Sequence, residues 1–237
     1  MSPEAPAAIA EAGPAVRLTG VRKRFGYRDV LRGVDLEIPC GSCFVIFGPN
    51  GAGKSTLLRI VATQWTFTSG RVEVLGEDVR KNPQAVRARL GLVLHDSFLR
   101  RELTLEENLR FACDLHGIAA AEGATRVDNL LERFGLAHRR KDVTATFSRG
   151  MLQRAGLARS LVSEPTLWIL DEPFSGLDPA GQDLLERSIR EFHLGGGTVL
   201  LVTHQVRVGS RLATASAHID DGTITRQGPG AAAVGAP

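Results

Sequence analysis

A glycine-rich segment with one lysine and two adjacent hydroxyl residues, GPNGAGKST at 48–56, directly follows the apolar run Cys43–Phe47. The apolar run is typical of a buried strand and residues 57–61 have helical character, so the glycines lie where a strand turns into a helix. Because glycine tolerates positive φ, the backbone N–H groups of such a loop can turn toward a phosphate, and the helix N-terminus adds partial positive charge. The segment therefore predicts phosphate binding.

The side chains of this loop make the prediction more specific. Lys54 supplies a point charge for the β- and γ-phosphates, and the Ser55 hydroxyl is a ligand that Mg²⁺ prefers. A plain glycine turn before a helix would not require this lysine and serine. The residues that we expect to contact the nucleotide are Gly48, Pro49, Asn50, Gly51, Ala52, Gly53, Lys54, Ser55 and Thr56.

Two acidic residues, Asp171 and Glu172, end the apolar run 167–170. At the carboxyl end of a strand in a doubly wound sheet, side chains open into the ligand crevice. Asp171 can then hold Mg²⁺, while Glu172 orients and polarises the attacking water. An Asp-Glu pair after a strand is weak evidence alone and strong evidence beside a phosphate loop; the alternative is a solvated turn.

His204 follows another apolar run, 198–203, and is expected at the same sheet edge. Its imidazole can donate a hydrogen bond to the γ-phosphate and so sense whether that group is present. Taken alone, a histidine after a strand is more often structural. Its coincidence with the two other segments favours a role in hydrolysis.

The elements that must position these residues indicate an α/β fold. Residues 16–18 and 34–38 alternate apolar and polar, which predicts an antiparallel β edge layer. Short apolar runs at 167–170 and 199–202 are typical of strands buried in a mostly parallel sheet. Between 103 and 161 apolar residues recur at helical spacing, which predicts a helical insert in a P-loop NTPase core.

The length and composition are those of one globular unit. The chain has 237 residues, of which 43% are apolar, and both ends are rich in Ala, Gly and Pro. No basic residue precedes Arg17, so the start lacks the basic region of a secretory signal. The expected organisation is a flexible tail at 1–13, a domain at 14–226 (core 14–95 and 162–226, helical subdomain 96–161) and a flexible tail at 227–237.

Composition and cysteine content argue against some classes of protein and of functional site. The net charge of +3 comes without a block of like charges, so nucleic acid is not an expected partner. No run approaches the roughly 20 apolar residues of a membrane span. Three cysteines without an export signal fit a reducing compartment, with the cytoplasm as default. Cys40 and Cys43 form a C-x-x-C, for which we favour a structural role over redox, metal or nucleophile chemistry.

When further motifs are added to these segments, the chain resembles the nucleotide-binding subunit of an ATP-binding cassette (ABC) transporter over about 16–222. The motifs carry the resemblance because six of them stand in the right order at suitable spacing. In chain order they are the adenine-stacking aromatic Phe25, the Walker A segment 48–56, the signature segment 147–151, the Walker B segment 167–172, the D-loop 175–178 and the switch at Thr203 and His204.

The resemblance implies ATP hydrolysis by two copies that close head to tail around two ATP molecules. Ser148 and the N–H groups at Gly150 of one copy would cap the γ-phosphate held by the other, and Asp178 belongs to the same nucleotide-contacting set. It also implies a separate integral membrane permease, on whose cytoplasmic helices the helical subdomain docks at the cytoplasmic face of the membrane. The residues expected to carry hydrolysis are Lys54, His95, Glu172 and His204, and those expected to hold Mg²⁺ are Ser55 and Asp171.

His95 is the first departure from the family pattern, because it stands where a glutamine usually contacts Mg²⁺ and the attacking water. Imidazole can hydrogen-bond water but offers no amide oxygen to the metal, so we expect contact through water. A purely structural His95 is the alternative. His95 and residues 102–111 are also similar to the heme-exporter ATPases of cytochrome c maturation.

The signature is the second departure: it reads Phe-Ser-Arg-Gly-Met at 147–151, where Leu-Ser-Gly-Gly-Gln is usual. Arg149 either serves the phosphate or faces solvent. Met151 resembles drug, polysaccharide and other ABC-2-type exporters, which favours an exporter.

Two other classes remain as alternatives. A soluble ABC ATPase acting on ribosomes or DNA usually has two linked cassettes or a long coiled coil, whereas this chain has one cassette and no heptads. A GTPase or small-molecule kinase is disfavoured because the sequence contains no Asn/Thr-Lys-x-Asp motif for guanine recognition.

Overall fold

The N-terminal part forms a four-stranded sheet with the order β2-β1-β4-β5. The computed structural model describes residues 13–94 and 98–232. Val16 to Leu18 and Val34 to Ile38 alternate between buried and exposed, and the strand pairs are antiparallel, so the predicted edge layer is confirmed. Its strands are β1 (Val16–Phe25), β2 (Arg28–Ile38), β4 (Ser69–Val74) and β5 (Glu77–Asp78).

A second sheet of six strands has the order β10-β9-β3-β8-β7-β6. Its strands are β3 (Cys43–Phe47), β6 (Leu90–Val93), β7 (Leu167–Asp171), β8 (Thr198–Val202), β9 (Ala215–Asp220) and β10 (Thr223–Pro229). All neighbours pair in parallel except β10 with β9. Every residue of β3, β7 and β8 is buried, as expected for parallel strands covered on both faces. The predicted mostly parallel core is confirmed.

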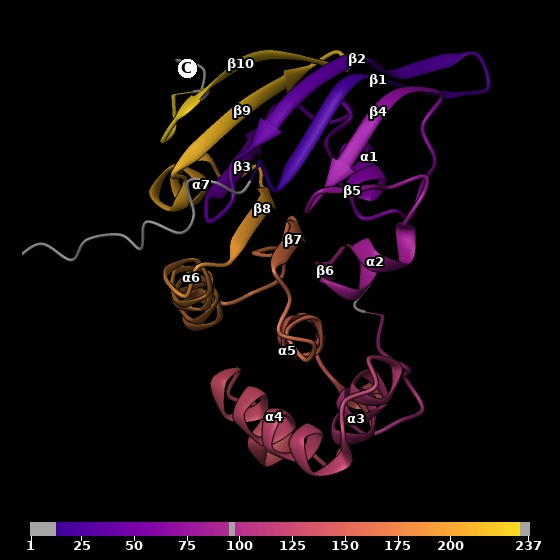
Figure 1. Cartoon of the computed structure of the whole chain (residues 1–237). Coiled ribbons are helices and arrows are strands. Elements are labelled where there is room, and N and C mark those ends of the chain that lie inside the picture. Colours follow the sequence, from indigo (N-terminus) through magenta and orange to yellow (C-terminus); the bar gives the residue numbers. More distant parts are fainter. Residues whose placement is uncertain (1–12, 95–97, 233–237) are drawn as a thin grey trace, which may run out of the picture.

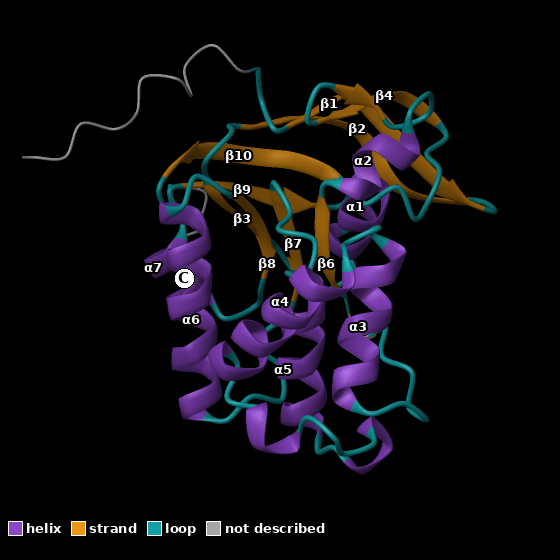
Figure 2. Ribbon diagram, turned by 60° about the horizontal axis from the view of Figure 1, so that its bottom comes forward, coloured by secondary structure: helices purple, strands orange, loops and turns teal. Residues whose placement is uncertain are grey.

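The helices divide between the sheets and a lobe. The helices of the core are α1 (Lys54–Val61), α2 (Pro83–Ala88), α6 (Pro179–Leu194) and α7 (Val206–Leu212). The lobe contains α3 (Leu105–Leu115), α4 (Ala120–Arg133), α5 (Arg149–Ser160) and 3-10 turns at Ala137–Arg139 and Thr144–Thr146. Figures 1 and 2 show the lobe at one end of the molecule and the antiparallel sheet at the other.

The lobe begins at a well-defined helix start. Thr104 Oγ1 accepts a hydrogen bond from Glu107 N at 3.2 Å, and Glu107 Oε2 accepts one from Thr104 N at 2.7 Å. This reciprocal capping satisfies N–H groups that the first turn of α3 leaves without helical partners. The buried Asn108 side chain also bonds both the N–H and the carbonyl of Arg100, at 2.7 and 3.0 Å. The loop that enters the lobe is therefore tied to α3.

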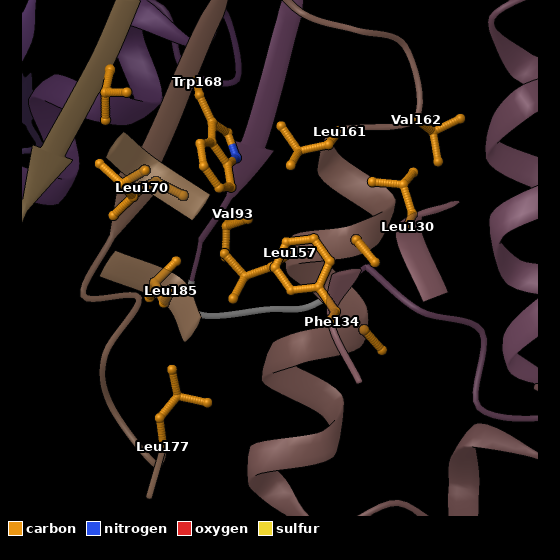
Figure 3. Close-up of a cluster of buried hydrophobic side chains, with 14 of the residues drawn as sticks. Val93, Leu130, Phe134, Leu157, Leu161, Val162, Trp168, Leu170, Leu177 and Leu185 are labelled. Atoms are coloured by element: carbon orange, nitrogen blue, oxygen red, sulfur yellow. The ribbon is translucent and has the colours of Figure 1, made fainter. Parts of the chain in front are cut away.

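The lobe and the parallel sheet share one hydrophobic core (Figure 3). Trp168 and Leu170 of β7 belong to the same buried cluster as Leu157 of α5 and Phe134 after α4. The Trp168 indole donates a hydrogen bond to Ser160 Oγ at 2.9 Å. Because β7 ends in Asp171 and α5 begins at the signature, this packing joins two functional segments in one rigid core.

The last strand runs beyond the expected end of the domain at 226. Gly228 and Pro229 of β10 pair with Ser216 and Ala215 of β9, so the hairpin continues to Pro229. Most of the predicted tails, 1–12 and 233–237, lies outside the described residues.

Candidate nucleotide-binding and hydrolysis site

The glycine loop lies between the buried strand β3 and helix α1, as the sequence predicts. Gly48, Gly51 and Gly53 have φ values of 148°, 81° and 106°, in the left-handed region that favours glycine. Gly53 directly precedes α1, so the N–H groups of the first helical turn are directed toward the loop. This arrangement is a cradle for an anionic group.

The hairpin turn between β9 and β10 packs against the glycine loop, and we call this contact the brace. Gly222 N donates a hydrogen bond to Ala52 O at 3.1 Å. A Cβ on Gly48 would lie 2.1 Å from the carbonyl oxygen of Ile219, so only glycine permits this approach. Sequence reasoning missed the brace. Asp221-Gly222 is a hairpin signal, but nothing local shows that this turn lies against a loop far earlier in the chain.

Lys54 is folded back over the loop that carries it. Its Nζ donates hydrogen bonds to the carbonyl oxygens of Gly48 and Pro49, at 2.7 and 2.8 Å. The side chain is buried, and this burial lowers the pKa of Lys54 although Glu172 and Asp171 favour its charged form. The ammonium is thus held at the loop, where phosphate oxygens would meet it.

Asp171 and Ser55 provide oxygen atoms that fit Mg²⁺. Asp171 is buried, the neighbouring Ser55 side chain favours the ionised form of its carboxylate, and its Oδ1 atom has no hydrogen-bond partner among the described residues. Burial raises the pKa of Asp171. A buried carboxylate oxygen without a partner is costly, and a bound cation would satisfy it.

The rest of a Mg²⁺ shell would come from the substrate. Residues 13–94 and 98–232 contain no group of three or more His, Cys, Asp or Glu side chains that could hold a metal. Mg²⁺ binds through few protein ligands together with phosphates and water. When bound, Mg²⁺ neutralises charge on the phosphates.

Glu172 and His204 lie at the ends of neighbouring strands and contact each other. Glu172 Oε2 is 2.8 Å from His204 Nδ1 and accepts a bond from His204 N at 3.1 Å. Glu172 has φ of 50°, unusual for a residue other than glycine, and its N–H is held by Val202 O at 2.9 Å. Strained backbone of this kind clusters at functional sites. Lys54, Ser55, Asp171, Glu172 and His204 thus converge at one sheet edge.

Ser148 and Asp178 each cap the helix that follows them in the chain. Ser148 caps α5, with its side chain accepting a bond from Met151 N at 3.3 Å, and Asp178 caps α6 by accepting one from Gly181 N at 2.9 Å. In the described part of the chain, no hydrogen bond or ion pair joins 148–150 to the loop at 48–56.

Phe25 lines a hollow of about 630 Å³ together with Gly51 of the loop. Its ring is 42% exposed, with Trp65 packed edge-on at 5.2 Å and Lys23 Nζ 4.6 Å from the ring centroid. An exposed aromatic ring next to the phosphate cradle suits a stacked base. Tyr27, fully exposed in the turn after β1, lines the same hollow and was missed by sequence reasoning.

The remaining sequence predictions concern Cys40, Cys43 and His95. Burial raises the pKa of Cys43 to about 12, and the Cys40 thiol bonds the carbonyl oxygen of Gly13 at 3.2 Å. Both cysteines are free, which supports the structural interpretation of the C-x-x-C. His95 lies outside the described residues, so its predicted part in hydrolysis stays a prediction.

Residues 31–175 match the sequence profile of a family described as ABC transporter. The chain belongs to this family. It is an ABC ATPase with a mixed α/β P-loop fold, as the resemblance implies.

Curated relatives include proteins of export and of import. The chain is 39% identical over 217 residues to the daunorubicin resistance ATP-binding protein DrrA3 of Streptomyces coeruleorubidus, covering 92% of this chain and 69% of the relative. It is 34% identical to the Nod factor export ATP-binding protein I of Ralstonia nicotianae, with 91% and 67% covered. It is 35% identical to the methionine import ATP-binding protein MetN of Rhizobium johnstonii, with 95% and 64% covered. This ABC ATPase thus spans about two thirds of the length of these relatives.

Solved structures of ABC ATPases share the whole fold. The structure of an ATP-binding subunit of an ABC transporter has a TM-score of 0.85 at 29% identity, covering 91% of this chain and 90% of that one. The ATP-binding cassette MJ0796, a dimer in a post-hydrolysis state bound to ADP and Pi, has a TM-score of 0.84 at 25% identity, with 90% and 98% covered.

Proposed function

We propose that this ABC ATPase is the motor subunit of an exporter, in which two copies close head to tail on ATP and move a separate membrane permease. The observation that carries this proposal is the division of the site within one chain. The phosphate cradle, Asp171, Glu172 and His204 gather at one sheet edge, whereas Ser148 and Gly150 lie at the start of a lobe helix, and among the described residues no hydrogen bond or ion pair joins them to the loop at 48–56. In this proposal, a second copy supplies its Ser148 and Gly150 to the phosphate cradle of the first.

The N-terminus of α5 is suited to a phosphate in that second copy. Free N–H groups and the helix dipole attract anions there, and Ser148 adds a hydroxyl. Ser148 is exposed at the end of the lobe. The structural neighbour bound to ADP and Pi is dimeric, which supports the proposal of a dimer.

A groove between the core and the lobe fits a helix of the membrane subunit. This docking groove has a volume of about 410 Å³ and exposes the apolar side chains of Phe98, Phe111 and Leu115. Arg100 and Arg159 lie over the rings of Phe111 and Phe98, at 4.4 and 5.2 Å from the ring centroids. An amphipathic helix with apolar and acidic side chains matches this surface. None of the helices described is long and apolar enough to span a membrane.

The direction of transport and the transported substrate are inferred from similarity to known proteins. The resistance and Nod factor export proteins favour export, while the likeness to a methionine import protein leaves the direction a proposal. Heme export for cytochrome c maturation stays a prediction from sequence, since it rests on His95 and residues 102–111. No observation favours the alternative of an ATPase that acts on ribosomes or DNA.

Detergent extraction of native membranes tests the motor proposal. We expect the chain to co-purify with an integral membrane protein, and Leu115→Asp to abolish this while ATP hydrolysis by the isolated chain continues. Leu194→Asp is the matched control, because Leu115 and Leu194 both end a helix and are 71% and 82% exposed. Purification of the unaltered chain without any membrane protein would contradict the proposal.

A further inference from the structure

Arg149 places a positive charge at the positive end of a helix. It is the first residue of α5, whose first turn contains no acidic residue. A cation at this position is opposed by the helix dipole, and anions or acidic side chains are favoured there. The helix itself therefore gives no reason for an arginine, and the reason must lie in a contact outside α5.

That contact is with the D-loop of the same chain. Arg149 Nη2 donates a hydrogen bond to Ser175 Oγ at 3.0 Å. The stem of Arg149 lies over Gly176, where a Cβ would come within 2.8 Å of Arg149 Nε. Gly176 has φ of 79°, and a Cβ on Gly150 would lie 3.2 Å from the Gly176 carbonyl oxygen. The start of α5 and the D-loop are thus in close contact.

One turn further along α5, Gln153 makes a second contact with the same loop. Its Nε2 donates a hydrogen bond to Pro173 O at 2.9 Å. Residues four apart lie on one face of a helix, so Arg149 and Gln153 hold the segment 173–176 at two points.

The segment that they hold directly follows the predicted water-orienting carboxylate. Ser175 N donates to Glu172 O at 3.1 Å, so Ser175 lies within one turn of Glu172. Glu172 is fixed on its other side by Val202 O and by His204. Because a single backbone turn joins the two residues, a displacement of Ser175 would also displace Glu172.

We propose that Arg149 is a positioning residue for ATP hydrolysis, which with Gln153 clamps the D-loop to the signature helix so that this helix and Glu172 move as one body. The clamp acts within one chain. It requires neither a membrane partner nor an export function, so those proposals can fail without affecting it.

Steady-state ATP hydrolysis by the full chain with Mg²⁺ tests the clamp. We expect Arg149→Ala and Ser175→Ala each to lower kcat by roughly fivefold, the size of one net hydrogen bond, with little change in KM for ATP. The double variant should lose less than the two single losses combined, because both changes remove the same hydrogen bond. Arg149→Lys should recover part of the rate, since a lysine also reaches Ser175 with an apolar stem. The control is Arg187→Ala, at an exposed arginine of α6, which should hydrolyse ATP at the normal rate.

Hydrogen exchange of the nucleotide-free chain gives a readout independent of turnover. Arg149→Ala should speed exchange of the amides at 174–177 and leave those at 48–56 unchanged. A loss of kcat in Arg149→Ala that Ser175→Ala does not share would overturn the clamp and indicate instead that Arg149 serves the phosphate of a second copy. Unchanged exchange at 174–177 would overturn it as well.

Discussion

Glu172 Oε2 lies 2.8 Å from Nδ1 of His204, so the two residues that were expected to act separately on the attacking water and on the γ-phosphate are paired with each other. With an ionised carboxylate, Nδ1 carries the proton, and Nε2 of the neutral ring is then an acceptor. His204 therefore donates to a phosphate only when it is protonated or has turned away from Glu172. The pair makes the histidine a means of orienting Glu172.

Replacing His204 distinguishes these roles. Asparagine places an amide N–H near the position of Nδ1, whereas glutamine places one near Nε2. We expect His204→Ala to lower kcat by roughly a hundredfold, and His204→Asn to retain more activity than His204→Gln. If steady-state kinetics showed the reverse order, the phosphate contact would be the dominant role.

Removal of the charge of Glu172 should separate ATP binding from hydrolysis. Glu172→Gln keeps the shape of the side chain and loses the carboxylate that is predicted to polarise water, so we expect hydrolysis to fall by at least about a hundredfold. The variant should then accumulate as a dimer with ATP and Mg²⁺, measured by light scattering after size exclusion. With ADP it should remain monomeric. Failure to dimerise on ATP would count against the head-to-tail arrangement.

Asp171 combines a cost in stability with a predicted role in metal binding. Because burial raises the pKa of Asp171, the folded chain keeps this proton to a higher pH than the unfolded chain. Ionisation of Asp171 therefore lowers the free energy of unfolding as the pH rises from the pKa of the unfolded chain, about 4, to the higher pKa of the folded chain. Asparagine does not ionise. Without nucleotide or Mg²⁺, Asp171→Asn should raise Tm by roughly 2–4 °C near neutral pH, with a smaller gain in acid, while Mg²⁺-dependent hydrolysis is lost.

Calorimetry at several pH values checks this expectation. A gain in Tm that stays the same from acid to neutral pH would show that ionisation of Asp171 is not its cause.

The brace behind the phosphate loop can be tested at Gly222. Its φ is 75°, and a Cβ there would lie 2.4 Å from Val30 O, so Gly222→Ala should push the turn away from Ala52. We expect a loss of roughly 1–3 kcal/mol in stability and weaker ATP binding, measured by denaturant unfolding and by titration. Gly76→Ala is the control, because Gly76 has φ of 82° with open space around it. Equal effects on ATP binding in the two variants would rule out the brace.

His95→Gln restores the residue usual in the family. We expect this variant to keep ATPase activity, because an amide supplies at least the hydrogen bonds to water that imidazole does. Steady-state hydrolysis with Mg²⁺ is the measurement, and complete loss of activity would contradict a water-mediated role for His95.

The sequence by itself determined the chemistry of this protein. Strand, glycine loop and helix at 43–61 are contiguous, and the Asp-Glu pair and His204 each follow a buried strand directly. Local patterns of this kind fix which groups reach the carboxyl edge of a parallel sheet. The α/β fold and the family followed from them.

Only the tertiary structure decided how these groups are held. Glu172 and His204 are 32 positions apart, Arg149 and Ser175 are 26 apart, and Gly222 meets Ala52 from the opposite end of the chain. Such contacts leave no periodic or local signal, because they depend on which strands become neighbours and on the packing between them. The extension of β10 to Pro229 has the same cause, since pairing with β9, rather than composition, orders a segment rich in glycine and proline.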